Sequence, residues 1–249
     1  MIRFDILESG SKGNATLVYD EDTLFQIDMG VPLKAVQKGL LHLGKSIDSI
    51  KAVLITHEHC DHVKTLDLLT DKVPVFASAN TVKSPCKTLV PYQRFSLGSF
   101  NIMPLQISHD AVNPIGFLIQ HQAESLVYVT DTGYLSDENL SLMKDATYYI
   151  IESNHDYKML LHSHRPACLK HRIHSDVGHL SNSDSAFYMA EEVGEATKGI
   201  FLAHLSEECN TPELALSTYE QAFIKQGLQP DRYHITCAKQ WEEVEGGDL

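Results

Sequence analysis

The order of hydrophobic and polar positions predicts an α/β chain. Short apolar runs rich in β-branched residues and bounded by polar residues recur along the sequence, and such runs are typical of buried strands. The strands expected from them cover residues 4–7, 16–19, 23–27, 52–55, 73–76, 100–107, 115–120, 126–130, 147–151, 199–202 and 233–236. Helices are expected over 32–41, 66–69, 78–82, 136–143, 159–161, 183–192 and 212–223, with an irregular stretch at 85–91 and a polar tail over 241–249.

Length and composition favour one globular domain over residues 1–249, because the sequence contains no linker, repeat or low-complexity tract. No apolar run approaches the roughly 18 residues that span a bilayer. The first residues lack the basic and apolar regions of a signal peptide. We therefore expect a cytoplasmic protein without a membrane partner. The 5 cysteines have no C-x-x-C spacing, so we expect reduced thiols, and we interpret Cys60 as filler within a polar segment.

The strongest chemical signal is the segment Thr56–His62, in which three imidazoles and a carboxylate directly follow a buried apolar run. Residues two apart in extended backbone face the same side, so His57 and His59 can converge on one point. A turn in the middle of the segment would aim Asp61 and His62 at a second point nearby. Neutral imidazole and carboxylate suit zinc, and also manganese or iron where oxygen ligands are added. The pattern therefore predicts two adjacent metal ions.

Other polar side chains follow predicted strands in the same way, namely Asp28, His109, Asp131, Glu152 and His204. A single histidine or carboxylate at such a position is ordinarily a satisfied polar group or part of a turn. Asp28 can act as a helix N-cap. It can also accept the distal N–H of a metal-binding imidazole, which fixes the tautomer and the ring orientation. The two roles of Asp28 are compatible.

Five segments carry a resemblance to a known family: Ser9–Asn14, Ile27–Gly30, Thr56–His62, Glu152–Asp156 and Gly178–Asn182. Together they resemble the metallo-β-lactamase superfamily, whose members are α/β proteins with a four-layer αββα sandwich (the metallo-β-lactamase fold) and metals at one edge. Within the superfamily they are similar to the WalJ/YycJ (VicX) branch of Gram-positive bacteria, a group described as DNA exonucleases. The segment Ser9–Asn14 has two interpretations, a hairpin turn beside the site or a glycine-rich phosphate cradle.

The resemblance implies a set of metal ligands. One ion would be held by His57, His59 and His109, the other by Asp61, His62 and His204, with Asp131 shared between them and Asp28 behind the histidines. Asp61 is also expected among the catalytic residues. The cofactors would be two divalent ions, zinc or manganese. Two such ions about 3.5–4 Å apart lower the pKa of a bound water towards 7 and stabilise charge on a phosphoryl oxygen, which suits phosphodiester hydrolysis.

The leaving oxygen in such a reaction needs a proton. His179, polarised by Glu152, is the candidate general acid, and His155 is the alternative. Four further residues are expected to bind substrate phosphate: Lys170, Arg172, Ser181 and Asn182. Ser181 or Asn182 would cap the helix that follows, and free N–H groups at a helix start bind anions. The alternative for this segment is a capped helix on a polar surface.

The main hypothesis is a dinuclear metal-dependent phosphodiester hydrolase that acts on DNA as an exonuclease. The net charge of −13 opposes it, because sequence-independent DNA affinity comes mainly from Lys and Arg. That charge favours the alternative of a phosphodiesterase for small cyclic or linear phosphate esters. A non-catalytic protein of a signalling complex is a third hypothesis, which a complete ligand set disfavours. The sequence gives no signal for the oligomeric state.

Overall fold

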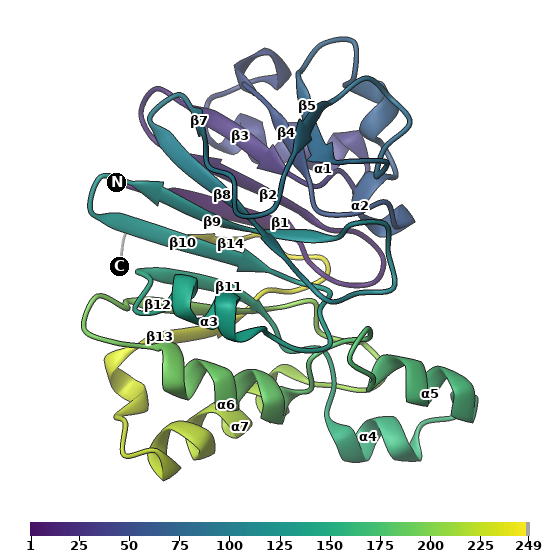
Figure 1. Cartoon of the computed structure of the whole chain (residues 1–249), viewed down its shortest axis with the longest axis vertical. Helices are drawn as coiled ribbons and strands as arrows, with labels where there is room; N and C mark the ends of the chain where they lie inside the picture. Colours follow the sequence, from purple (N-terminus) through teal and green to yellow (C-terminus); the bar gives the residue numbers. More distant parts are fainter. Residues whose placement is uncertain (248–249) are drawn as a thin grey trace.

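The computed structural model describes residues 1–247, and within them the strands form two seven-stranded sheets (Figure 1). The first sheet has the order β14 (Val244–Gly246), β1 (Arg3–Glu8), β2 (Ala15–Tyr19), β3 (Leu24–Ile27), β4 (Val53–Ile55), β5 (Val75–Ser78) and β6 (Lys87–Leu89). The second has the order β13 (His234–Cys237), β12 (Gly199–Ala203), β11 (Tyr148–Glu152), β10 (Glu124–Val129), β9 (Ile115–His121), β8 (Phe100–Gln106) and β7 (Phe95–Leu97).

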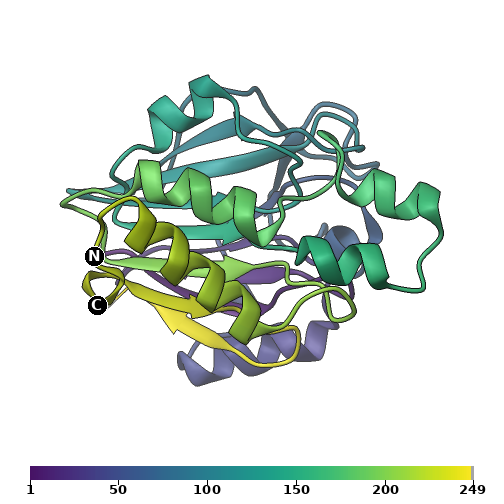
Figure 2. The same ribbon diagram turned by 90° about the horizontal axis from the view of Figure 1, so that it is seen from below.

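Helices cover the outer faces of both sheets (Figures 1 and 2). The α-helices are α1 (Leu33–His42), α2 (Cys60–Val63), α3 (Asp137–Met143), α4 (Tyr157–His162), α5 (Ala167–Ile173), α6 (Asn182–Glu192) and α7 (Pro212–Lys225), and the 3₁₀ turns are η1 (Ile47–Ser49), η2 (Leu66–Leu68) and η3 (Pro230–Arg232). Buried residues of α1 pack on the first sheet, and those of α3, α6 and α7 pack on the second. The prediction of a four-layer αββα sandwich is confirmed.

The apolar core lies in three layers, one between the sheets and one under the helices on each side. Parallel pairing joins β3 to β6 through β4 and β5, and β10 to β13 through β11 and β12. Central parallel strands are covered on both faces, which explains their continuous apolar runs. Because parallel strands end at the same edge, polar residues that follow them are brought together there.

Several predicted elements were wrong. The helix expected over 78–82 is the end of β5 followed by a turn, in which the Ser78 and Thr81 hydroxyls bond each other and Asn80 has φ 65°. The irregular stretch contains β6, and the polar tail contains β14, which pairs antiparallel with β1. Residues 248–249 of that tail lie outside the described part. Neither β7 nor α5 was predicted, and the expected helix over 66–69 is the 3₁₀ turn η2.

The pair α4 and α5 projects beside the sandwich (Figures 1 and 2), joined to it near the end of β11 and near the start of α6. Residues 157–174, which span the pair, contain four of the 20 Lys and Arg residues of the chain and none of its 33 Asp and Glu residues. Among residues 1–247, no helix combines the length and apolar character needed to cross a membrane.

Candidate metal centre and active site

The candidate site lies at the edge where strands of both sheets end. The segment after β4 supplies Thr56–His62, and the second sheet supplies residues that follow β8, β10 and β12. The Ile115 amide, at the start of β9, donates to the Thr56 carbonyl (3.0 Å) and so joins the two edges. Close backbone approach is needed here, since a Cβ on Gly30 would lie 1.5 Å from the Asp61 carbonyl oxygen. Glycine therefore allows the turn after β3 to touch the histidine-rich segment.

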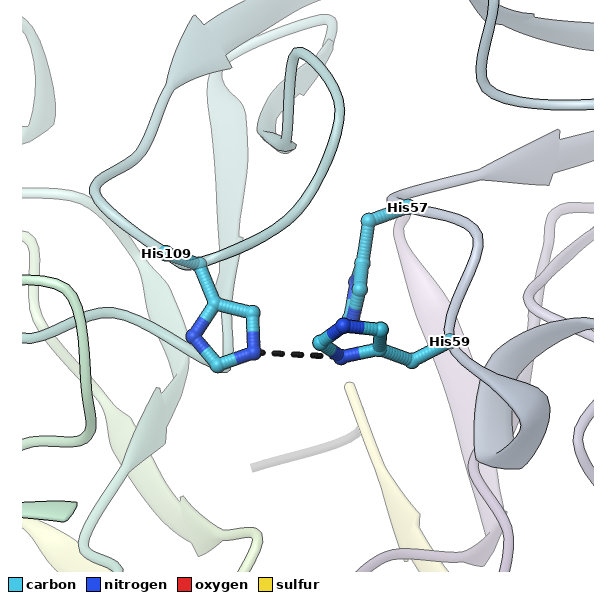
Figure 3. A group of neighbouring side chains, drawn as sticks. All are labelled: His57, His59 and His109. Carbon is cyan, nitrogen blue, oxygen red and sulfur yellow. Dashed lines mark hydrogen bonds between the residues drawn. The ribbon is translucent and has the colours of Figure 1, made fainter. Parts of the chain in front are cut away.

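Three imidazoles form the first group of potential ligands: His57, His59 and His109 (Figure 3). One ligand atom from each lies within 4.8 Å of the others, and His109 Nε2 is 3.3 Å from His59 Nδ1. His57 Nδ1 lies 3.1 Å from Thr56 Oγ1, and His109 Nδ1 donates to the Gly178 carbonyl (3.1 Å). These contacts leave the Nε2 atoms of His57 and His109 free to face a shared centre.

A second group consists of Asp61, His62 and His204, again with one ligand atom from each within 4.8 Å of the others. The short helix α2 turns the chain after His59, so that Asp61 and His62 reach towards His204, and the His62 ring still lies 4.0 Å from that of His57. Asp61 Oδ2 lies 3.6 Å from His62 Nε2 and 3.7 Å from His204 Nε2. Residues distant in sequence therefore meet at this second point.

Asp131 lies between the two groups and is 2% exposed. Its Oδ2 atom is 3.2 Å from His62 Nε2, and its Oδ1 atom is 3.9 Å from His109 Nε2. Oδ1 is also 3.4 Å from His204 Nδ1. The carboxylate thus contacts imidazoles of both groups, as a shared ligand requires.

Two buried carboxylates orient the imidazoles of the second group. His62 Nδ1 donates to Asp28 Oδ2 (2.7 Å), and Asp28 also accepts from the Thr56 amide and hydroxyl. His204 Nδ1 donates to Glu152 Oε1 (2.9 Å), a contact that the sequence analysis missed. The signal for it was available, because Glu152 is the single charged residue of an otherwise apolar buried strand, at its end. Such hydrogen bonds fix which ring nitrogen is left for a metal.

The two groups differ in charge state in the metal-free protein. Burial holds the pKa of His57 well below its usual range and lowers that of His109. Burial also opposes protonation of His62, but Asp28 and Asp131 outweigh it and raise the pKa of His62 to about 10. Burial is likewise outweighed at His204, where Asp131, Asp61 and Glu152 raise the pKa well above its usual range. His57 and His109 of the first group are thus held neutral, whereas His62 and His204 of the second form imidazolium–carboxylate pairs.

Three residues of the site have left-handed backbone: Asp28 (φ 59°), Asp131 (φ 56°) and His204 (φ 55°). This conformation is uncommon for residues other than glycine and costs free energy. Asp28 and His204 follow β3 and β12 directly, and Asp131 follows β10 after one residue, so the chain reverses and the side chain stays at the sheet edge. Aspartate and histidine are among the residues other than glycine that adopt this conformation most often.

His179 lies beside both groups. Its Nδ1 atom donates to Glu152 Oε1 (2.9 Å) and is 3.6 Å from Asp131 Oδ1. The ring is 5.1 Å from that of His109 and 5.3 Å from that of His204. The side chain is 14% exposed, so it lines the opening of the site. Charge from His179 and the contacts with His179 and His204 outweigh burial and lower the pKa of Glu152 to about 2, which keeps that carboxylate ionised.

His155 lies deeper, fully buried, with Nε2 3.3 Å from His174 Nδ1. Burial and the neighbouring His174 lower the pKa of His155 to about 4. It belongs to neither group of potential ligands, and its Nδ1 atom has no hydrogen-bond partner within residues 1–247. The structure therefore brings His179, but not His155, to the opening.

The four residues expected to bind phosphate have other partners in this structure. Ser181 Oγ caps α6 by accepting from the Asp184 amide (3.1 Å), and the buried Asn182 bonds Ser153 and Asn210. Arg172 is paired with Asp110, and Lys170 Nζ donates to the Leu161 carbonyl (2.6 Å). Asn182 and Ser181 therefore have structural roles, and the two cations lie on the surface of α5.

Buried nitrogen atoms without partners test whether this site suits a metal. His57 Nε2 and His204 Nε2 are buried and make no hydrogen bond within residues 1–247, one in each group. An unpaired buried nitrogen costs free energy unless another partner satisfies it. Each atom faces other imidazole or carboxylate ligands, which are the donors that divalent transition metals prefer. The residues fit divalent metal ions.

An αββα sandwich with buried imidazoles and carboxylates at one edge defines a class of metal-binding fold, and comparisons with known proteins agree. Residues 25–204 match the model of the β-lactamase superfamily domain. The chain is 34% identical over 240 residues to exodeoxyribonuclease YycJ of Bacillus anthracis, covering 91% of each protein. It is 35% identical over 231 residues to exodeoxyribonuclease WalJ of Streptococcus pneumoniae D39, covering 87% of this chain and 86% of that one.

Among solved structures, the metallo-β-lactamase fold protein YhfI from Bacillus subtilis superposes with a TM-score of 0.74 at 17% identity, covering 98% of this chain and 99% of that one. At that identity the likeness concerns the fold. The chain belongs to the metallo-β-lactamase superfamily and, within it, to the WalJ/YycJ-like branch.

Proposed function

We propose that the protein is a dinuclear metal-dependent phosphodiester hydrolase that degrades DNA as an exonuclease. The observation that carries the proposal is the pair of ligand groups, His57–His59–His109 and Asp61–His62–His204, with Asp131 between them. Relatives that are 34% and 35% identical are named exodeoxyribonucleases, which supports DNA as the substrate. The complete set of seven potential ligands argues against a non-catalytic role in a signalling complex.

Two divalent ions, zinc or manganese, would be held by these seven residues, one by each group. When bound, such ions lower the pKa of a water molecule and offset negative charge on phosphoryl oxygens. Asp28 and Glu152 fix the tautomers of His62 and His204, so each ring presents Nε2 to the centre. Asp61 contributes a carboxylate on the side of the second group.

His179 supplies the proton for the leaving oxygen. Its Nδ1 is held by Glu152, so Nε2 is the ring atom that faces substrate at the opening. A carboxylate behind an imidazole stabilises the protonated ring and fixes its orientation. His155, the alternative acid, is fully buried and remains neutral because of its low pKa, so it is less suited to this step.

DNA reaches the site from the side of α4 and α5. Lys158 lies on α4, and Lys170 and Arg172 lie on α5. Arg165 lies between the two helices, where it pairs with Glu208, and the chain after α5 leads to His179. Arg172 is anchored by Asp110, the residue after His109. A local basic surface compensates for the net charge of −13 by attracting phosphates where they are cleaved.

A phosphodiesterase for small esters is the second candidate, favoured by the acidic net charge. The test is to incubate metal-loaded protein with end-labelled linear duplex DNA, covalently closed plasmid and bis-p-nitrophenyl phosphate. We expect progressive shortening of linear DNA from an end under Mn²⁺ or Zn²⁺, with the plasmid intact. Hydrolysis of the small ester without any shortening of DNA would favour the second candidate.

A further inference from the structure

The single tryptophan of the chain, Trp241, is 63% exposed yet held in a defined orientation. Its Nε1 donates to Glu207 Oε1 (3.1 Å), and Lys12 Nζ lies 5.4 Å from the ring centroid. Lys12 also pairs with Glu207 Oε2 (2.5 Å). A solvent-facing indole does not contribute to a core, so Lys12 and Glu207, from distant segments, hold an aromatic side chain that is mostly exposed.

The loop over residues 9–14 connects this surface to the metal centre. At one end, Asn14 Nδ2 is 3.0 Å from His62 Nε2, and Ser9 Oγ accepts from the His204 amide (2.9 Å). At the other end, Gln240 accepts from the Lys12 amide (3.2 Å) and donates to the Gly13 carbonyl (3.1 Å). Trp241 thus directly follows Gln240, which is hydrogen-bonded to the loop over residues 9–14. The same loop contacts His62 and His204 of the second ligand group.

Two details support a built binding surface. Gly10 has φ 150°, a conformation that L side chains rarely adopt, and a Cβ there would also displace Gln240 Oε1, which would lie 2.3 Å away. A cavity of about 260 Å³ is lined by Glu207, the residue that bonds Trp241. It is bordered by Leu205, Ser206, Asn210, Thr211, Lys239 and Gln240, among others. Its walls therefore come from the chain after His204 and the chain before Trp241.

We propose that Trp241 stacks on a nucleobase of the DNA strand that occupies the metal centre, with the Lys12 ammonium beside the adjoining phosphate. The inference rests on the proposed function and names a further contact for that substrate, connected to the second group by the loop over residues 9–14. Base stacking on an aromatic ring is sequence-tolerant because every base has a π-face. Such a contact suits an enzyme that must accept each nucleotide in turn.

Intrinsic fluorescence gives a direct test, since Trp241 is the only tryptophan. Metal-free protein, which cannot cleave, is titrated with a single-stranded oligodeoxythymidylate and with an abasic strand of equal length. We expect saturable quenching by the thymidine strand and little quenching by the abasic strand, although both carry the same charge. Equal quenching by the two strands, or none by either, would overturn the proposal.

Variants provide the second measurement. In a labelled-oligonucleotide anisotropy assay Trp241→Ala should weaken binding by about 5- to 100-fold, whereas Trp241→Phe, which retains a ring, should bind within about threefold of wild type. In DNA degradation the loss should fall on KM rather than kcat. Phe187→Ala, which removes a 50% exposed aromatic from α6, is the matched control and should change neither.

The two proposals fail separately. If wild-type protein shortens DNA but Trp241→Ala binds the thymidine strand as wild type does, the stacking surface is wrong and the nuclease function stands. If quenching is base-dependent but metal-loaded protein cleaves no DNA, the exonuclease proposal is wrong and the surface binds single strands for another purpose.

Discussion

The two ligand groups use the same side-chain chemistry in different surroundings. Neutral oxygens satisfy the distal nitrogens of the first group, the Thr56 hydroxyl for His57 and the Gly178 carbonyl for His109. Carboxylates do so in the second group, Asp28 for His62 and Glu152 for His204. The first group therefore offers neutral donors to a cation, and the second adds negative charge close to it. The groups that contact the distal nitrogens, and not the ligand residue types alone, therefore determine how much negative charge each ligand group places near a metal ion.

The largest effect should follow loss of a first-group ligand. His59→Ala removes one of three imidazoles, so we expect kcat/KM on DNA to fall by about 10³-fold or more, equivalent to roughly 4 kcal/mol of transition-state stabilisation. Metal content per protein, measured by mass spectrometry, should fall as well. The neighbouring exposed Cys60 is the control, and Cys60→Ser should preserve both values. Full turnover by His59→Ala would contradict the metal mechanism.

Removal of the negative charge behind His62 tests whether the carboxylates beside the second group strengthen metal binding there and not at the first group. Asp28→Asn leaves a hydrogen-bonding group behind His62 but removes its charge, so we expect metal affinity at one of two sites to fall about 10- to 100-fold. Competition with a chromophoric chelator measures the metal affinity of each site. Asp20 pairs with His121 away from the site (3.1 Å), and Asp20→Asn should bind metal normally. Equal weakening of both sites by Asp28→Asn would mean that the groups do not act separately.

Asp5, a buried carboxylate outside the site, shows the effect of burial where no imidazole is hydrogen-bonded to the carboxylate; Glu243 and Glu245 add to that effect, and His42 opposes it. Burial raises the pKa of Asp5 to about 6, although a hydrogen bond from Tyr19 (3.1 Å) opposes the rise. Between the unfolded value of about 3.9 and this folded value, the folded state binds more protons, so its stability decreases as pH rises.

Asp5→Asn should therefore stabilise the protein by about 1–2 kcal/mol at pH 8 and by almost nothing at pH 3.5, relative to wild type at the same pH. Denaturant unfolding at the two pH values measures the difference. The exposed Asp22→Asn should show no such pH dependence. Destabilisation at pH 8 by Asp5→Asn would show that the carboxylate has an unrecognised cationic partner.

The smallest expected effect is on DNA affinity, when a single cation of α5 is removed from this acidic protein. Arg172→Ala and Lys170→Ala should each weaken DNA binding by about two- to fivefold and reduce the slope of log K against log salt by about 1. Arg94→Ala, on an exposed strand edge, is the control. An unchanged salt slope in both α5 variants would move the DNA path away from α5.

Much of this site could be predicted because its ligands follow conspicuous apolar runs. Asp61 was recognised within the histidine-rich segment itself, whereas His109 and Asp131 were assigned as ligands from the resemblance to the metallo-β-lactamase superfamily. The elements that were missed lack that signal. The strand β6 is short and mostly exposed, β14 contains only Val244–Gly246, and α5 has seven residues of which Ile173 alone is buried.

Features that depend on tertiary contact could not be read from sequence. The hydrogen bond from His204 to Glu152 joins residues 52 positions apart. The helix cap at Ser181, by contrast, is local and was among the two caps predicted. Aspartate adopts left-handed backbone more often than most residues, but its residue type alone does not predict that conformation at Asp131. Trp241 was assigned to a polar tail, because its neighbours Lys12 and Glu207 lie far from it in the sequence.

Anomalous diffraction from crystals of Mn²⁺- or Zn²⁺-loaded protein would test the central claim most directly. The account predicts two peaks, one bounded by His57, His59 and His109 and the other by Asp61, His62 and His204, with Asp131 touching both. A single peak, or peaks bounded by other residues, would contradict it.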